Sequence, residues 1–446
     1  TRDDSDIRAL GYGANAGVGA AGVVTAFAER DSTVTTEVAD NSAVGEDKNR
    51  GNLQLNASTT GDVRSEAWGA TAGIIATGNA AVAESRDQSS VHASLGDNVE
   101  LIAADADINA VTHGLNEARA MGASASLGAS LGASVARAIS QQEVLASTGD
   151  NVTLDSGNDL SVTAERRSLT EEGDVRARAW GGTGGLLLGA DAAYAEVNQN
   201  NHVQAYTGRS LSMRGGGNLN INSSNEASGL ANASGVTFGG ILAVGAAISH
   251  LSDSTSTSAK LGDDARLGTW AEDGPENGIG QIAINAESKP LNRATAFAGT
   301  GGVIAGQVVE TQTTTDNEVE AVIGGNSKIF ADSIDLASYY TPTYGSFAES
   351  ISAAALQRSG ASAEDNILGA NKSIIGADSI LLTGAHQRHL AETMIKTRHG
   401  DDKHENLAVN AGSGGVASGS AARHRTKLDV DTVVEVARGG ALQSGL

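Results

Sequence analysis

Apolar and polar residues alternate in short segments that recur along the whole chain. The clearest copies read LQLNA at 53–57, LSVTA at 160–164, LNINS at 219–223 and IAINA at 282–286. Alternation with a period of two places the apolar side chains on one face of a β-strand. The first apolar residues of successive segments are spaced 55, 52, 59 and 63 residues apart, at Leu53, Ile108, Leu160, Leu219 and Ile282. The chain is therefore predicted to be a repeat protein with a period of about 55 residues.

Two further features keep step with these strands. A turn headed by Gly precedes most of them, as at Gly96-Asp97 and Gly149-Asp150. Glycine tolerates a positive φ, and aspartate hydrogen-bonds its own backbone, so this pair is typical of turns. A run rich in Ala and Gly completes each unit, at 13–28, 67–83, 118–138, 179–195, 231–247, 294–306, 353–363 and 408–422.

The small-residue runs allow two interpretations. Alanine is the best helix former, but each glycine in a helix interior costs about 1 kcal/mol, and most runs hold several. We expect extended segments whose small side chains let two sheets approach closely, and we keep helix as the alternative. The segments 61–73 and 173–185 match with Trp68 and Trp180 in register, which indicates a super-repeat of two units, 112 residues long.

The whole chain, residues 1–446, is predicted to be one continuous array of about eight units. The fold class is all-β, a β-solenoid with large Ala/Gly-rich coils in which each rung pairs with the next at about 4.8 Å. Whether one unit makes one large rung or two ordinary rungs stays open. The approximate units are 1–60, 61–113, 114–172, 173–225, 226–290, 291–341, 342–389 and 390–446.

Composition narrows the function classes. The chain has no Cys, which excludes disulfides and thiol catalysis, and aromatic residues make up only 3%. A net charge of −23 opposes nucleic-acid binding, and no apolar run of about 18 residues predicts a transmembrane helix. The array begins and ends in phase without a distinct capping unit. We therefore expect either a piece of a longer chain or end-to-end stacking with neighbouring copies.

Two groups of residues are weak metal candidates. The turn acids Asp97, Asp150, Asp263 and Asp264 could stack in successive coils and bind calcium, although simple turn stabilisation explains them as well. His386, His389, His399 and His404 lie in one window and could ligate a metal. The surrounding Lys and Arg residues oppose a cation there. An exposed insertion loop, or a patch for an anionic ligand or partner, are the alternatives.

An enzymatic interpretation has little support in the sequence. Glu100, Asp105 and Asp107 could act as paired carboxylates of a β-helical polysaccharide lyase or hydrolase. Acidic residues are common throughout the chain, however, and no nucleophile motif accompanies these three. We expect no enzymatic activity, no catalytic residues and no cofactor other than a possible calcium ion.

The unit xVxAxxGDNVxLxAxxDLxVxA, cleanest at 91–110 and 144–164, resembles the repeat region of giant Gram-negative filamentous adhesins and exoproteins of the filamentous-haemagglutinin and leukotoxin-type class. The resemblance implies a right-handed β-helix, export to the extracellular space or the bacterial cell surface, and a role in adhesion or biofilm. It favours a structural stalk or filament segment whose partners are further repeats, glycans or host and bacterial surfaces. The main alternative is a carbohydrate- or partner-binding face around 386–427.

Overall fold

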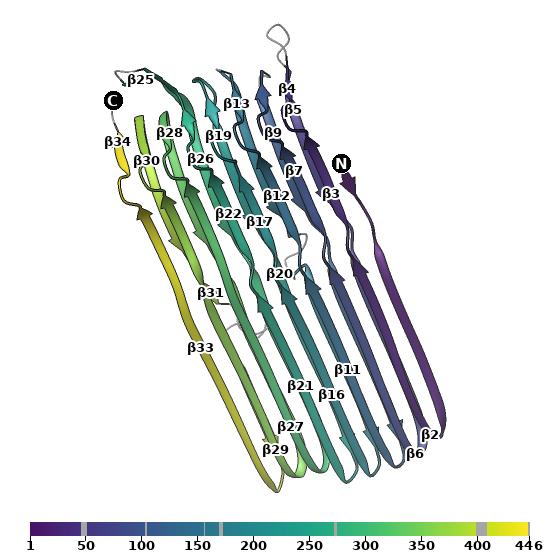
Figure 1. The fold of residues 1–446 in the computed structure, drawn as a ribbon. Coiled ribbons are helices and arrows are strands. Elements are labelled where there is room, and N and C mark those ends of the chain that lie inside the picture. The colour runs from purple at the N-terminus through teal and green to yellow at the C-terminus, as the bar shows by residue number, and fades with distance from the viewer. Residues whose placement is uncertain are drawn as a thin grey trace.

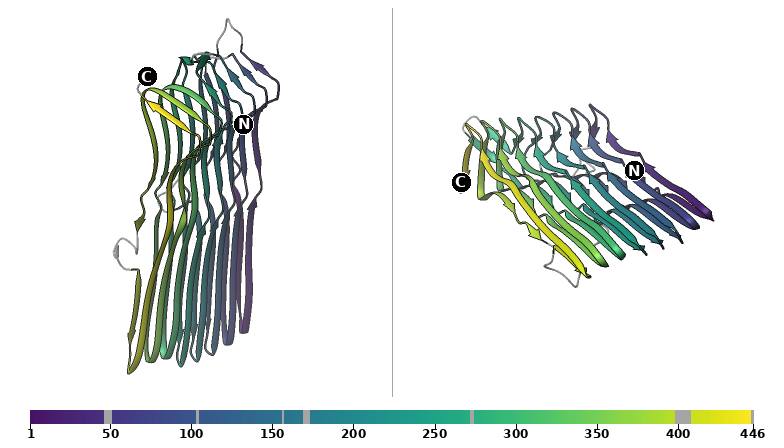
Figure 2. Two further views of the ribbon diagram at one scale, coloured as in Figure 1. Left: turned by 60° about the vertical axis from the view of Figure 1, so that its left-hand side comes forward. Right: turned by 90° about the horizontal axis from the view of Figure 1, so that it is seen from below.

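The chain is an all-β solenoid, as predicted. A computed structural model describes residues 1–45, 51–102, 105–155, 157–168, 173–271, 274–397 and 408–444, and all its regular elements in these ranges are strands. Apart from one small hairpin, every strand pairing is parallel, between equivalent segments of successive coils. Figures 1 and 2 show the coils stacked side by side, each with a long extension that points to the same end of the molecule.

Each coil has two parts, which the second coil illustrates. Strand β6 (Val63–Asp87) runs out, reverses near Gly73 and runs back, and we call this out-and-back segment the arm. Strands β7 (Ser90–Leu95), β8 (Glu100–Leu101) and β9 (Asp105–Thr112) then enclose a wider region, the base. In Figure 1 the arms form the lower part of the molecule and the bases the upper part.

The arms are formed by strands that reverse within one element or by two strands joined at a tip. In chain order they are β2 (Ile7–Arg30), β6, β10 (Asn116–Ser126) with β11 (Ala129–Ser140), β15 (Val175–Gly185) with β16 (Leu188–Gln199), β20 (Ser228–Gly239) with β21 (Leu242–Asp253), β27 (Leu291–Ile323), β29 (Thr343–Ile375), and β32 (Val409–Gly414) with β33 (Ala417–Val436). We number the coils 1 to 8 in the order of these arms. The later parts of β27, β29 and β33 continue into the base.

The base is built from three rows of strands. The first row holds β3 (Thr33–Val38), β7, β12 (Glu143–Thr148), β17 (His202–Tyr206) and β22 (Ser256–Leu261). The second holds β4 (Ala43–Val44), β8, β13 (Thr153–Leu154), β18 (Ser212–Met213), β23 (Arg266–Leu267) and β34 (Ala441–Ser444). The third holds β1 (Arg2–Asp3), β5 (Leu53–Thr59), β9, β14 (Asp159–Arg166), β19 (Leu219–Asn225) and β26 (Ile279–Ser288). The long strands β28 (Lys328–Tyr340) and β30 (Ile380–Thr393) join the last two rows.

Three short strands lie outside this scheme. Strands β24 (Thr269–Ala271) and β25 (Gly274–Asn277) form a small antiparallel hairpin. Strand β31 (Lys396–Thr397) pairs with the start of β29.

Strand register settles both open questions about the repeat. Val162 pairs with Ile108 in the coil before and with Ile221 in the coil after, so one sequence unit makes one large rung. The small-residue runs are extended, because Ala120 pairs with Ala67 on one side and Ala179 on the other. The helical alternative is wrong, because the glycine-containing runs gain a coil-to-coil hydrogen-bond ladder in the extended form.

The turns before the second row correct one detail of the sequence argument. The positive φ lies at Asn98 (54°) and Asn151 (57°), not at the glycines that head these turns. Gly149 is required for another reason. A Cβ there would lie 2.5 Å from the carbonyl carbon of Gly96 in the coil before, a closer approach than packed atoms allow.

The two parts of the coil have different cores. Large aliphatic side chains fill the base and stack in ladders such as Ile108, Val162, Ile221, Ile284 and Leu336, each at most 1% exposed. The arm core is mainly alanine, because its two legs face each other at short distance. The light composition of the chain is therefore concentrated in the arms.

Candidate functional site

The four turn acids connect successive coils through hydrogen bonds. Oδ1 of Asp97 accepts from the backbone N–H of Asp150 at 2.7 Å, and Oδ1 of Asp150 accepts from the N–H of Arg209 at 2.7 Å. Asp263 accepts from the N–H of Gly325 at 2.9 Å, and Asp264 from the side-chain amide of Asn326 at 3.1 Å. These bonds support the turn interpretation. Across the described ranges, no three His, Asp or Glu residues are grouped to hold a metal ion.

The histidine candidates do not converge where they can be followed. His386 and His389 lie on β30, three residues apart. Side chains alternate between the two faces of a strand, so residues three apart point to opposite sides. His386 is exposed, whereas His389 is partly buried, and that burial lowers the pKa of its imidazole. His399 and His404 lie outside the described residues.

The three carboxylates considered for catalysis lie on the outside of the base. Glu100 is exposed on β8, while Asp105 and Asp107 share the outward face of β9. Asp107 pairs in register with Gln54 and Ser161 of the adjoining coils. Its side chain therefore belongs to a polar outer row of the solenoid.

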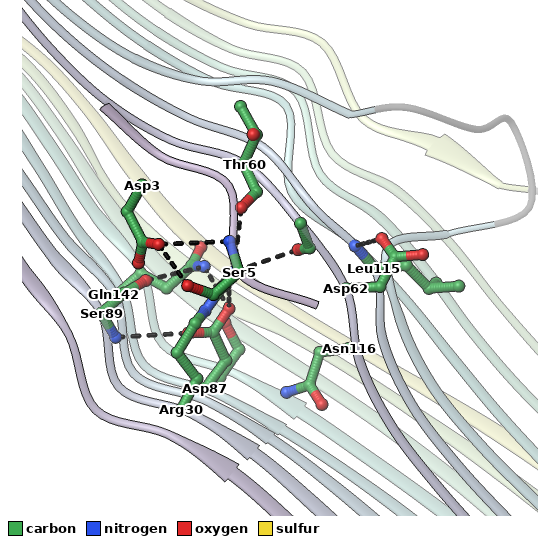
Figure 3. Close-up of polar contacts among 12 residues, drawn as sticks. Asp3, Ser5, Arg30, Thr60, Asp62, Asp87, Ser89, Leu115, Asn116 and Gln142 are labelled. Carbon is green, nitrogen blue, oxygen red and sulfur yellow. Dashed lines mark hydrogen bonds and ion pairs between the residues drawn. The ribbon is translucent and has the colours of Figure 1, made fainter. Parts of the chain in front are cut away.

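A buried polar network marks the boundary between arm and base. The guanidinium of Arg30, 2% exposed, donates to both carboxylate oxygens of Asp87 at 3.1 and 2.6 Å (Figure 3). Gln142 in the next coil donates to the same carboxylate at 2.6 Å and accepts from Arg166 at 2.7 Å. Burial lowers the pKa of Arg166 against the opposing charges of Asp174, Asp253 and Asp87.

The same boundary row continues into later coils. The Ser140 hydroxyl donates to the side-chain carbonyl of Asn201 at 2.9 Å. The side-chain amide of Asn317 donates to the buried Asp253 carboxylate at 3.2 Å, and its side-chain carbonyl accepts from the Thr255 N–H at 2.8 Å. Polar side chains thus occupy one position of the coil from the first to the sixth, namely Arg30, Asp87, Ser140, Gln199, Asp253 and Thr315. Because a buried polar group is costly unless it is bonded, this network fixes where each arm leaves the base.

The outer half of the arm has a polar interior. A ladder of hydroxyl and amide residues faces the space between the legs, namely Asn15, Thr71, Ser124, Thr183, Thr237, Thr300 and Ser352. Several of these groups meet no hydrogen-bond partner in the structure, including the hydroxyls of Thr71, Thr183 and Thr237. Polar residues here occupy the positions that apolar residues occupy in the base.

A second inward row alternates large polar residues with glycine. In register it reads Gly22, Asn79, Gly132, Asp191, Gly245 and Gln307. A Cβ on Gly132 would lie 2.6 Å from a carboxylate oxygen of Asp191, so each large side chain takes the space left by glycines in the neighbouring coils. Asn79 and Asp191 are 112 residues apart, which gives the two-unit super-repeat a packing cause.

Asp191 is the most perturbed carboxyl of the arm. Its side chain is 5% exposed, and neither oxygen has a hydrogen-bonding side chain within reach. Burial raises its pKa from 3.8 to about 7, with the N–H of Ala192 only partly offsetting the effect. A carboxyl in this position is protonated much more readily than one in water.

The outside of the same arm region is apolar and free of charge in the first six coils, whereas Arg358 is exposed there in the seventh. The second arm carries no charged residue between Glu66 and Glu84, and the third carries none between Arg119 and Arg137. Large aliphatic side chains stand exposed near the tips, among them Val18, Ile74, Ile75, Leu127, Leu186, Leu187, Ile241 and Val303. The outer arm is therefore inverted, with polar groups inside and apolar groups outside.

An aromatic groove lies on the outward leg of the first four arms. Tyr12, Trp68, Met121 and Trp180 form one outward row, and the rings of Tyr12 and Trp68 are 6.4 Å apart at their centroids. Glycine and alanine in the next two positions leave a hollow of about 440 Å³ beside them. Arg119 and Arg178 border the row on the side of the base.

Comparison with known proteins yields no relative. No protein-family model matches this chain, and no curated protein or solved structure matches it. Within the described residues, no helix is long and apolar enough to cross a membrane.

The aromatic groove and the inverted arm are the features that sequence reasoning missed. The match of Trp68 to Trp180 was visible as a repeat, but its meaning depended on knowing that both side chains point outward. The sequence separates the two faces of each run, because residues of one face alternate with residues of the other, but it does not say which face is inside. In the second arm, Thr71, Thr77 and Asn79 share one parity, while Trp68, Ala70 and Ala72 share the other.

Proposed function

We propose that this chain is a structural stalk or filament segment of an extracellular or surface-displayed bacterial adhesin or biofilm matrix protein. The observation that carries the proposal is the unbroken parallel pairing of equivalent segments through all eight coils. Every coil is held to its neighbours by strand ladders in both arm and base, so bending or shearing the stack must break many hydrogen bonds together. Such a body is suited to reach and to bear load.

Side-chain ladders support the same proposal. The Asn98 amide donates to Asn41 at 3.2 Å, and the Asn151 amide donates to Asn98 at 3.2 Å, so the turns are bonded along the solenoid axis as well. The boundary network adds buried bonds between successive coils. These bonds join successive coils in addition to the backbone ladders.

Mechanical and imaging experiments test the stalk. In single-molecule pulling along the solenoid axis, we expect resistance followed by stepwise release, with each step lengthening the chain by one coil, about 180 Å. Antibodies raised against the chain should label fibres outside the producing cell in electron micrographs. Smooth extension at low force, or label confined to the cell interior, would contradict the proposal.

Carbohydrate binding is a second candidate, favoured by the aromatic groove. Aromatic faces present large apolar areas, and the neighbouring Arg side chains offer hydrogen-bond donors, a combination suited to a sugar chain laid along the axis. Trp68 and Trp180 are two rungs apart, about 10 Å. A glycan array should give a signal that Trp68→Ala and Trp180→Ala both weaken, with Trp270→Ala as the control. A flat array removes this candidate.

A further inference from the structure

The outer parts of the arms are layered by distance from their tips. In coil 4 the tip is formed by Leu186 and Leu187, which are 64% and 54% exposed. Trp180, six residues before this tip, and Tyr194, seven residues after it, lie on the outer surfaces of the two legs. Between them and the tip, the outward-facing positions hold only Gly, Ala and Leu. The first outward-facing charge on each leg follows two residues closer to the base.

The same layers recur in the neighbouring coils. The aromatic level of the outward legs reads Tyr12, Trp68, Met121 and Trp180 in register. One level closer to the base, the row reads Leu10, Glu66, Arg119 and Arg178. Glu66 is 8% exposed and pairs with Arg8 at 3.1 Å. The corresponding charged row of the return legs reads Glu84, Arg137 and Glu196. Charge is thus confined to the base side of the aromatic level in these coils.

Coils 6 and 7 mark the limit of this region. Glu310 stands at the level of Tyr194 in coil 6, and Arg358 lies four residues closer to the tip in coil 7. In coils 1 to 6, whose arm tips the structure describes throughout, no charged residue faces outward on the tip side of the aromatic level. Each of these tips exposes one or two large aliphatic side chains, such as Ile75 and Leu127, and the tips follow one another along one end of the molecule (Figure 1).

Backbone groups at the tips are bonded from coil to coil. The N–H of Leu187 donates to the carbonyl of Gly128 at 3.1 Å, and the N–H of Ile241 donates to the carbonyl of Leu187 at 3.2 Å. The N–H of Ile304 donates to the carbonyl of Ile241 at 2.8 Å. The polar side chains of the outer arm, such as Thr183, lie between the legs. A lipid environment requires that backbone polar groups be bonded within the protein, and the tips meet this requirement.

The depth of the layers matches one leaflet of a phospholipid bilayer. Trp180 and Leu186 are six residues apart, which is about 20 Å along a strand. The hydrocarbon of one leaflet is about 15 Å thick, and the interface above it adds about 5 to 7 Å. With Trp180 in the interface, the tip would therefore reach the middle of the bilayer without crossing it. Trp and Tyr are the residues enriched at this interface.

The next level fits the phosphate layer. Arg119 and Arg178 come two residues before Met121 and Trp180, about 7 Å further from the tips. A guanidinium group matches the oxygens of a phosphate with two parallel hydrogen bonds. The distribution of apolar surface also distinguishes lipid from a protein partner. A protein would cover one surface of an arm, whereas here both leg surfaces and the tips between them are apolar to the same depth.

We propose that the arm tips of coils 1 to 6 insert into one leaflet of a phospholipid bilayer. The Trp68 and Trp180 rings lie in the interface, Arg119 and Arg178 lie at the phosphates, and the base stays in water. This assigns the aromatic row to lipid in place of the carbohydrate considered above. The stalk proposal rests on pairing between coils and this one on the side chains of the tips, so each can fail without the other.

Flotation with phosphatidylcholine vesicles tests the insertion. The unaltered chain should rise with the vesicles in a sucrose gradient. Leu187→Asp should weaken this partitioning at least about 100-fold, because a carboxylate is strongly disfavoured in the hydrocarbon. Leu187 points into solvent, so the circular dichroism of the variant should be unchanged. Met394→Asp is the matched control, because Met394 is 49% exposed but follows β30, outside the arms, and it should float like the unaltered chain.

Three outcomes of this experiment overturn the proposal. One is an unaltered chain that stays at the bottom of the gradient. Another is an equal loss of flotation in Leu187→Asp and Met394→Asp. The third is an oligomer, measured by light scattering without vesicles, that does not float and that Leu187→Asp converts to monomer. That result would assign the tips to a second copy of the chain.

Depth-dependent quenching tests the order of the layers. The chain has three Trp and no Cys, so the Trp68→Phe, Trp270→Phe variant keeps Trp180 alone, and Leu187→Cys gives a single site for a fluorescent label. In vesicles with nitroxide lipids, Trp180 should be quenched more by a nitroxide near the headgroup. The label at position 187 should be quenched more by a nitroxide near the end of the acyl chain. Equal quenching at the two depths, or the reverse order, would overturn the proposed insertion.

Discussion

The base and the arm of each coil use the same backbone pairing and opposite side-chain rules. In the base, apolar residues such as Leu160 and Ile221 are fully buried and polar residues face outward. In the outer arm, Thr183 and Asp191 lie inside while Trp180 and Leu186 lie outside. The hydrogen-bond ladder between coils is therefore sufficient to build a regular two-sheet arm with little apolar burial, and only the base has a conventional core.

This difference predicts which kind of substitution destabilises each region. A core of large aliphatic residues loses stability when a side chain is shortened, because a cavity forms. A core of alanine has nothing to shorten and loses stability when a side chain is enlarged. Substitutions of opposite kinds should therefore separate the two regions.

Shortening a base residue should have the largest effect. Leu160 is 0% exposed between Ala106 and Leu219 of the neighbouring coils. We expect Leu160→Ala to lower the free energy of unfolding by about 4 kcal/mol, within the range for buried leucines. Denaturant titration followed by circular dichroism measures this. Leu127→Ala, at an arm tip and 64% exposed, is the matched control and should change stability by less than about 0.5 kcal/mol.

Removing the buried carboxyl of the arm should have the next largest effect, and it should depend on pH. The folded pKa of Asp191 is about 7, above its unfolded value of 3.8, so the folded state holds the proton more tightly. Stability from this group is therefore full below about pH 4, falls as the pH rises to 7, and stays low above it. Asp191→Asn should remove this dependence and stabilise the protein by up to about 4 kcal/mol at pH 8.

The inward row already accepts an amide at the positions equivalent to Asp191. Asn79 and Gln307 occupy them two coils away on either side, so the variant should fold without rearrangement. Asp97→Asn, at an exposed turn, serves as the control for a general change in net charge. A variant whose stability keeps the pH profile of the unaltered chain between pH 4 and 8 would show that the Asp191 carboxyl is hydrated.

Enlarging an arm residue should have an intermediate effect. Ala120 is 0% exposed between the two legs, where it stacks with Ala67 and Ala179. We expect Ala120→Leu to cost about 2 kcal/mol, because the added carbons must push the legs apart. Ala125→Leu is on the exposed outer face of the same strand and should be nearly neutral in a thermal melt. Equal effects of the two substitutions would mean that the legs are not closely packed.

Much of this contrast could be predicted from the sequence, and part of it could not. The alternation in LSVTA and LNINS identifies the base strands and their inward faces, because a period of two has one meaning in a half-buried strand. The runs of Ala and Gly predict extended segments in close contact, because glycine disfavours a helix and small side chains let two sheets approach each other. Parity within a run such as 67–83 shows two faces but does not say which is inside, because both hold small residues.

The candidate sites were harder to predict, because their geometry depends on contacts between coils. Asp97 and Asp150 lie in successive coils, as expected, and each carboxylate accepts a hydrogen bond from a backbone N–H of the following coil. The residue before each of these N–H groups is a Gly, which has no Cβ and so permits the close approach. His386-x-x-His389 resembles a ligand pair only if the segment is helical, and in a strand the two rings separate. The groove at Trp68 is formed by side chains of adjoining coils. It could not be located from the sequence, because the spacing between equivalent residues of successive coils varies by several residues.

The turn ladder should give the smallest effect and the finest comparison. Asn151 has a φ of 57°, where a Cβ-bearing residue other than Asn or Asp costs about 1 kcal/mol or more. Asn151→Ala should therefore cost about 1 kcal/mol, and Asn151→Gly, which permits the same φ, should cost a few tenths, for the lost amide bond to Asn98 alone. The difference between the two variants in the same denaturant titration isolates backbone conformation from the ladder. If alanine and glycine cost the same, the amide ladder and not the left-handed turn holds these corners of the base.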